Sequence, residues 1–294
     1  MAVALTQEGA FGFALQTERG AYASPTVWVP LVNDDDPEGV FVRWRRNYTV
    51  LDMGDGNDFQ SRYFAASSWL EGRVVVPLVP GSMTALISWI QDRDQDNQGK
   101  WASLIVDHVN AVQKATDVKV RRARLVLRKG CPAHVVLWLV GLKVEDGSPS
   151  AVNVPTATPY QFGEASFEVA SNGKALEGDD AIEELIVDLD NAIEDPAVSA
   201  PQHLYNLAGV RARGRVVRDF VDSVLHADFM GGQEAALRLA LTRGASICSL
   251  CLPRLLYVAE DLGLPAAGAR RIMQTIDFVA LGSLDGLTAP VVLA

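Results

Sequence analysis

Two long runs of alternating residues, at 117–129 and 134–144, constrain the fold of this 294-residue chain most strongly. Apolar and polar side chains alternate along both runs, which is the pattern of strands that bury one face. The turn residues at 130–132 lie between the runs, so we expect a hairpin. In the first run the alternation slips by one residue near Arg122, which predicts a β-bulge and therefore a bent strand.

Strand patterns also occur elsewhere, at 72–78, 101–106, 184–190, 210–216, 235–241, 246–258 and 272–281. A helix is expected behind the N-cap Ser82, because an apolar stripe with helical spacing runs from Met83 to Ile90. A second helix is expected at 219–230, with Gly231 and Gly232 as its stop. Strands outnumber helices, so the predicted class is mainly β, an antiparallel sandwich or barrel with a few short helices.

A stretch marked by proline and serine divides the chain into two parts of similar size. We expect a first β-rich half at 1–147, a linker at 148–160 and a second β-rich half at 161–294. Each half has strand signals, then one short helix, then more strands. That common order suggests an internal duplication, although the residues show no repeat strong enough to prove it.

Charge and composition limit the functions open to the chain. Its formal net charge of −10 argues against a general nucleic-acid binder, which needs a basic surface to displace phosphate counterions. An acidic protein surface repels the DNA phosphates, so it suits a channel through which DNA passes better than a surface that binds DNA. Three cysteines form no disulfide framework, and neither a signal peptide nor an apolar run long enough for a membrane helix is visible. We therefore expect synthesis in a reducing cytoplasm and no membrane partner.

Enzyme signatures are not evident, and no cofactor is expected. The sharpest chemical candidate is a split zinc site made of two pairs, Cys131 with His134 and Cys248 with Cys251. Both pairs lie in or beside strand patterns, where residues three apart point to opposite faces. Buried cysteines are also common as small apolar residues, so a zinc-dependent module is the weaker hypothesis.

Charged runs supply candidates for contacts between copies of the chain. A solvated surface is the simplest interpretation of any single run. A β-rich subunit that stacks on itself would instead set opposite charges on opposed faces, and arginine suits such contacts better than lysine. The candidate residues are Arg121, Arg122, Arg124, Arg211, Arg213, Arg215, Asp34, Asp35 and Asp36.

Three stretches carry a family resemblance: the opening at 12–31, the strand–helix run at 72–90 with 101–104 and 123–144, and the second half from 181 through 209–220 to 252–254. In pattern and order the chain resembles the tail tube proteins of long-tailed bacteriophages. It is similar through them to the tube subunits of contractile tails and type VI secretion systems. The Cys/His pairs are not a feature of that family.

The resemblance implies a non-enzymatic virion protein that forms stacked rings, the conduit through which phage DNA passes from capsid to host without specific binding. Family members join their inner strands across subunits in hexameric rings, or in trimeric rings where the chain is duplicated. The implied partners are copies of the chain, a tape measure protein and tail tip or terminator proteins. A tail terminator, another connector or a secretion-tube homologue remains the alternative.

Overall fold

The computed structural model describes residues 9–30, 39–51, 62–81, 83–107, 112–147, 152, 154, 157–171, 173–195, 204–263, 271–282 and 290–293, with backbone only at 47–51, 62–67 and 146. The predicted N-cap Ser82 and the predicted contact residues Asp34, Asp35 and Asp36 lie outside these residues.

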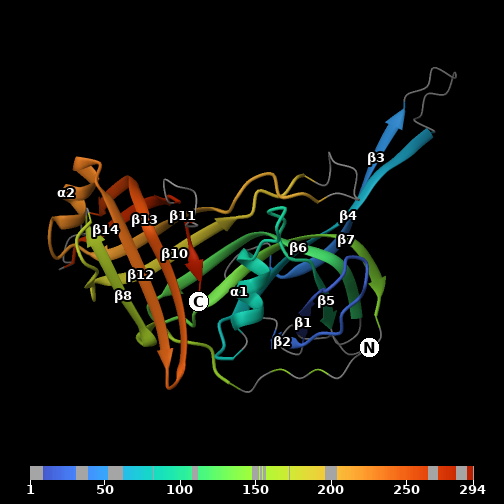
Figure 1. Ribbon diagram of the computed structural model, residues 1–294, viewed down its shortest axis with the longest axis horizontal. Helices are drawn as coiled ribbons and strands as arrows, with labels where there is room; N and C mark the ends of the chain where they lie inside the picture. Colours follow the sequence, from blue (N-terminus) through green and yellow to red (C-terminus); the bar gives the residue numbers. More distant parts are fainter. Residues whose placement is uncertain are drawn as a thin grey trace.

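Strands dominate both halves of the chain (Figure 1). The first half contains β1 (Ala10–Leu15), β2 (Val27–Pro30), β3 (Phe41–Leu51), β4 (Arg62–Pro77), α1 (Met83–Gln91), β5 (Ala102–Asp107), β6 (Val112–Arg128) and β7 (His134–Asp146). The second half contains a 3-10 turn (Phe162–Glu164), β8 (Ala165–Ser171), β9 (Glu177–Gly178), β10 (Ile182–Asp190), β11 (Arg211–Asp219), α2 (Val224–Gly231), β12 (Glu234–Arg243), β13 (Ser246–Gly263), β14 (Met273–Ala280) and β15 (Val292–Leu293).

All of these strands belong to one 15-stranded antiparallel sheet. The predicted class, mainly antiparallel β with a few short helices, is confirmed, and the sheet is not closed into a barrel within the described residues. No helix in the described part of the chain is both long and apolar enough to cross a membrane.

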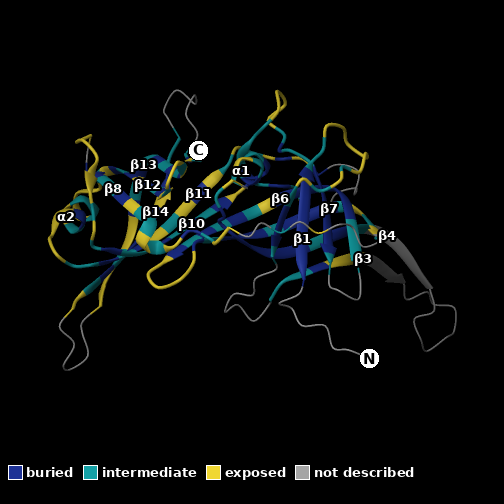
Figure 2. Ribbon diagram, turned by 90° about the horizontal axis from the view of Figure 1, so that it is seen from below, coloured by how far each residue is buried: buried dark blue, intermediate teal, exposed yellow. Residues whose placement is uncertain are grey.

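The long strand β6 connects three parts of the sheet. The start of β6 pairs with β5, its end pairs with β10, and β7 lies along its opposite edge. The register of β6 against β7 shifts between Val120 and Arg122, which confirms the bulge predicted from the alternation slip. Apolar side chains from strands of both halves meet in one large core, and buried residues are coloured dark blue in Figure 2.

The helices follow the sequence signals to different degrees. Helix α1 forms as predicted and buries Leu86, Trp89 and Ile90. Helix α2 begins five residues later than the predicted start at Asp219, because Asp219 still pairs with Met273 in the sheet. Its end is as predicted, since Gly232 adopts the left-handed conformation with φ 61° and closes the helix.

The two halves have the same strand order, which supports the predicted duplication. The first half runs β3-β4-β7-β6-β5-β1-β2, and the second runs β10-β11-β14-β13-β12-β8-β9. Each strand therefore has a counterpart at the same place. Along the chain, each half carries its helix between its fourth and fifth strands, as β4-α1-β5 and as β11-α2-β12. The repeated strand order is visible in the pairing of the backbone, and an internal duplication stays a prediction.

Pairing also identifies a short residue-level repeat that the sequence analysis missed. Gly72-Arg73-Val74-Val75 in β4 and Gly214-Arg215-Val216-Val217 in β11 occupy equivalent places. Gly72 lies opposite Leu139 of β7, and Gly214 lies opposite Phe278 of β14. In turn Leu139 lies opposite Val120 of β6, and Phe278 lies opposite Tyr257 of β13. The pairing register shifts directly after Val120 in the first half and directly after Tyr257 in the second. The bulge is therefore repeated along with the strand order.

The two glycines predict different responses to an added methyl group. At Gly214 a Cβ atom would overlap the Ile186 carbonyl oxygen and the Phe278 ring, whereas at Gly72 the nearest atoms are 3.4 Å away. Gly214→Ala should therefore lower the free energy of unfolding by about 1–3 kcal/mol, while the matched Gly72→Ala should change it by less than about 0.5 kcal/mol. Urea denaturation measures both values, and equal effects would contradict the close approach at Gly214.

Candidate functional site

The halves are joined by backbone pairing between β6 and β10. Arg122 lies opposite Asp190, Arg124 opposite Asp188 and Arg128 opposite Glu184. The core face of this junction carries alternate apolar residues, of which Leu127 and Leu185 are buried. Because two former sheet edges are paired here, the backbone donors and acceptors of both strands are satisfied.

Opposite charges line the other face of the junction. Asp188 accepts hydrogen bonds from Arg124 Nε at 2.8 Å and from Arg122 Nη2 at 2.8 Å. Burial alone would raise the pKa of Asp188, but the hydrogen bonds from Arg124 and Arg122 outweigh burial and lower it. Arg213 of β11 lies directly opposite Asp188 on its other side, so the carboxylate is flanked by arginines on both neighbouring strands.

Equivalent positions of the two halves carry different side chains on this face. The guanidinium groups of Arg73, Arg122 and Arg124 lie 5.7, 4.9 and 5.7 Å from the Trp138 ring centroid. In the second half Asp277 stands where Trp138 stands in the first, and Arg215 Nε binds Asp277 Oδ1 at 2.7 Å. A cation–π cluster and an ion pair thus fill the same place.

A buried polar network fixes the chain beside the end of β10. Asn191 donates from Nδ2 to the carbonyl oxygens of Ile90, at 2.9 Å, and Val120, at 2.7 Å. Lys119 Nζ donates to the Leu204 carbonyl at 2.8 Å and to Asn206 Oδ1 at 2.9 Å. Burial, assisted by the charge of Arg93, lowers the pKa of Lys119 to about 8. The network ties helix α1, β6 and the segment after β10 together.

Among the described residues, β2, β9, β3 and part of β13 each have one side without a neighbouring strand, and the open sides of β3 and β13 lie at opposite ends of the molecule (Figure 1). β3 pairs with β4 along one side, and its other side carries no strand within the described residues. β13 pairs with β14 up to Gly263, but its pairing with β12 stops at Leu256. The edge beyond Leu256 is likewise without a strand among the residues that the structure describes. These open edges are the counterparts of the paired edges of β10 and β6.

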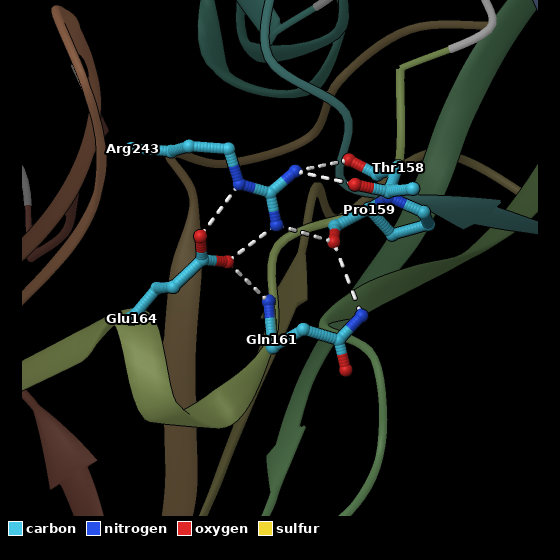
Figure 3. Close-up of polar contacts among 5 residues, drawn as sticks. All are labelled: Thr158, Pro159, Gln161, Glu164 and Arg243. Carbon is cyan, nitrogen blue, oxygen red and sulfur yellow. Dashed lines mark hydrogen bonds and ion pairs between the residues drawn. The ribbon is translucent and has the colours of Figure 1, made fainter.

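The end of the predicted linker is held against both halves. Arg243 binds the Glu164 carboxylate and donates to the carbonyl oxygens of Thr158 and Pro159 (Figure 3). Tyr160 exchanges backbone hydrogen bonds of 2.8 Å with Leu78 and Ala133 of the first half. Hydrogen bonds from Arg243 and from the Gln161 backbone lower the pKa of Glu164 to about 2. The division into two domains at 148–160 stays a prediction.

The structure gives several predicted contact arginines partners within the chain. Arg122 and Arg124 bind Asp188, and Arg215 binds Asp277. The remaining predicted arginines, Arg121, Arg211 and Arg213, are exposed. A role for any of them in contacts between copies stays a prediction.

The four candidate zinc ligands fall in different surroundings. Cys131 is exposed in the turn before β7, which begins at His134, while Cys248 is buried in β13. Among the described residues, no three or more metal-ligating side chains are gathered into one group. Burial raises the pKa of Cys248 to about 11, which opposes the thiolate that zinc requires.

Sequence reasoning missed the acidic members of the junction, Asp188 and Asp190, and the open edges of β3 and β13. The available signal was the repeated Gly-Arg-Val-Val, which aligns the two halves residue by residue. Once the halves are aligned, Asp188 of β10 and Arg43 of β3 occupy equivalent positions.

No known protein family and no curated protein matches the chain. Among the solved structures that match is a chain described as "Cryo-EM structure of the anti-feeding prophage (AFP) baseplate, 6-fold symmetrised". That match has 14% identity and a TM-score of 0.32, and it covers 50% of this chain and 97% of the other.

Asp188 is predicted to stabilise the junction in a pH-dependent way. Asp188→Asn should lower the free energy of unfolding at pH 7 by about 1–2 kcal/mol, because two arginines lose their carboxylate. The pKa of Asp188 is lowered in the folded chain. The stabilisation by its carboxylate is therefore fully present at a pH above the ordinary aspartate pKa of about 4, and it is lost as the pH falls through the lowered pKa of the folded chain. Urea titrations at neutral and acidic pH measure it. Asp277→Asn, in a more exposed pair, serves as the control and should cost less.

Glu164 is predicted to hold the linker end over a wider range of pH. Its folded pKa of about 2 lies below the ordinary value of about 4.3, so its contribution is present above the ordinary value and disappears as pH falls through about 2. Glu164→Gln should lower the melting temperature at pH 7, and the difference from the parent chain should vanish near pH 2. Scanning calorimetry tests this, with exposed Glu177→Gln as control. An unchanged melting temperature at pH 7 would contradict the role assigned to Arg243 and Glu164.

Proposed function

We propose that the chain is a structural subunit that joins copies of itself edge to edge in closed rings, and that the stacked rings form a phage tail tube. The observation that carries the proposal is the pairing of β6 with β10, which already joins two equivalent units in one continuous sheet. The same molecule leaves the counterparts of those two strands open at its opposite ends, on β13 and β3. A second copy can continue the sheet by the contact that the chain makes internally.

An assembly of this kind is head-to-tail, because the contact uses two different edges. Head-to-tail contacts give a ring when the rotation between units closes, and a helix when it does not. Two equivalent units in each chain favour a trimeric ring with pseudo-six-fold symmetry over a hexameric one. Ring closure would also protect edges that otherwise invite aggregation.

The identification as a tail tube rests on the sequence resemblance, which predicts a non-enzymatic β-rich subunit of this kind. The net charge of −10 supports a passage for DNA better than a binding surface. In the proposed setting the protein is made in the bacterial cytoplasm and becomes part of the virion tail. Its proposed partners are other copies, a tape measure protein and tail tip or terminator proteins, with DNA passing through the lumen without specific contacts.

The assembly state tests this proposal. We expect purified protein at high concentration to give trimeric rings by light scattering, and annuli or hollow stacks by negative-stain microscopy. Single rings that never stack would contradict the tail tube and favour a terminator. A protein that stays monomeric at high concentration, and in the presence of tail tip components, would contradict both.

A further inference from the structure

We infer that the open edge of β13 pairs with β3 of a second copy in a defined antiparallel register that places Asp261 opposite Arg43, with the charges reversed relative to the internal junction. This inference rests on the proposed ring and names the contact that closes it. The partner is a second copy of this chain, chosen because the molecule contains an internal example of the same contact.

The register follows from the equivalence of the two halves. Past the repeated bulge, Arg122 pairs with Trp138 in the first half, and Ala259 pairs with Asp277 in the second. Two residues further, Arg124 therefore corresponds to Asp261.

The other side of the contact aligns in the same way. Gly72 faces Val42 in β3 and Gly214 faces Val187 in β10, so Arg43 corresponds to Asp188. Because Arg124 lies opposite Asp188 inside the chain, Asp261 would lie opposite Arg43 of the next copy.

The charges at these positions form two complementary rows of opposite sign. Across the internal junction the row is Arg124, Asp188 and Arg213, on β6, β10 and β11. The corresponding row across two copies is Asp261, Arg43 and Glu71, on β13, β3 and β4. Arg43 and Glu71 already face each other within one chain, with Arg43 Nε 3.6 Å from Glu71 Oε2. Asp261 would add the third charge.

Burial points to the same contact. Leu125 is 8% exposed inside the internal junction, whereas its counterpart on the open edge, Leu262, is 37% exposed. Leu189 is 3% exposed, and its counterpart Trp44 is 36% exposed. Leu262 and Trp44 are therefore uncovered where their counterparts are covered, as expected if a second copy covers them, while Val42 on the same edge is already buried at 8%.

Reversal of charge makes the two junctions non-interchangeable. Pairing of the β6 edge with β3 would place Arg124 against Arg43, and pairing of the β13 edge with β10 would place Asp261 against Asp188. Both alternatives set like charges on adjacent strands, which is destabilising. The internal contact therefore cannot be replaced by a swapped one without repulsion, and the charges favour pairing of β13 with β3 over either swapped pairing.

Charge exchange tests this contact. Asp261→Arg should weaken ring formation by about tenfold or more, because it sets arginine against Arg43, and the effect should shrink at high salt. The triple variant Asp261→Arg, Arg43→Asp, Glu71→Arg copies the internal row of charges and should restore rings. Glu18→Arg, an exposed acid away from both edges, should leave assembly unchanged and serves as the matched control. Sedimentation velocity measures assembly, and circular dichroism verifies that each variant is folded.

The outcomes separate this inference from the proposed function. A parent chain that forms no ring contradicts the proposed function itself. A parent chain that forms rings, together with an Asp261→Arg variant that assembles equally well, overturns only the assigned contact. Loss of rings in Asp261→Arg without recovery in a folded triple variant overturns Arg43 as the partner.

A cysteine pair measures the register without changing charge. In a Cys131→Ser background, Leu262→Cys with Val42→Cys places the two thiols on directly opposed residues, the counterparts of Leu125 and Val187. Oxidation should link copies into covalent oligomers on a non-reducing gel. Leu262→Cys with Arg43→Cys is shifted by one residue, so the thiols point to opposite faces and should not link. Equal linking by both pairs would contradict the register.

Discussion

Pairing of strand edges is the constraint on which the rest of this structure depends. An unpaired edge exposes a row of backbone donors and acceptors, and the chain removes two such rows by joining β6 to β10. To reach β10 while still pairing with β5, β6 must be long and must bend at its bulge. The polar network around Asn191 and the clamp at Arg243 then hold the connecting segments where this junction needs them.

The two halves share their strand order and pairing while their side chains differ at equivalent positions. Strand order, helix placement and the bulge are shared, yet Trp138 in one half corresponds to Asp277 in the other. Backbone hydrogen bonds do not depend on side-chain identity, so the frame tolerates such changes. The charges on the outer face were therefore free to take opposite signs at equivalent positions.

The internal junction combines extended strand pairing with a continuous apolar core. The apolar core runs through both halves, so the internal junction is supported by burial as well as by hydrogen bonds. If copies join as we propose, the junction between chains would repeat this combination, and the ring would have one kind of contact geometry throughout. The opposite charge rows would then decide which edges meet.

The sequence by itself determined the local elements: the hairpin of β6 and β7, the bulge near Arg122, the start of α1 and the stop of α2 at Gly232. These features depend on residues close together in the chain, and alternation or helical spacing reports them directly. Tertiary structure alone decided that 122–128 pairs with 184–190, that Arg124 binds Asp188, and which strand edges stay open. Those outcomes depend on the pairing register between segments that are distant in the chain, and local patterns of hydrophobicity carry no information about that register.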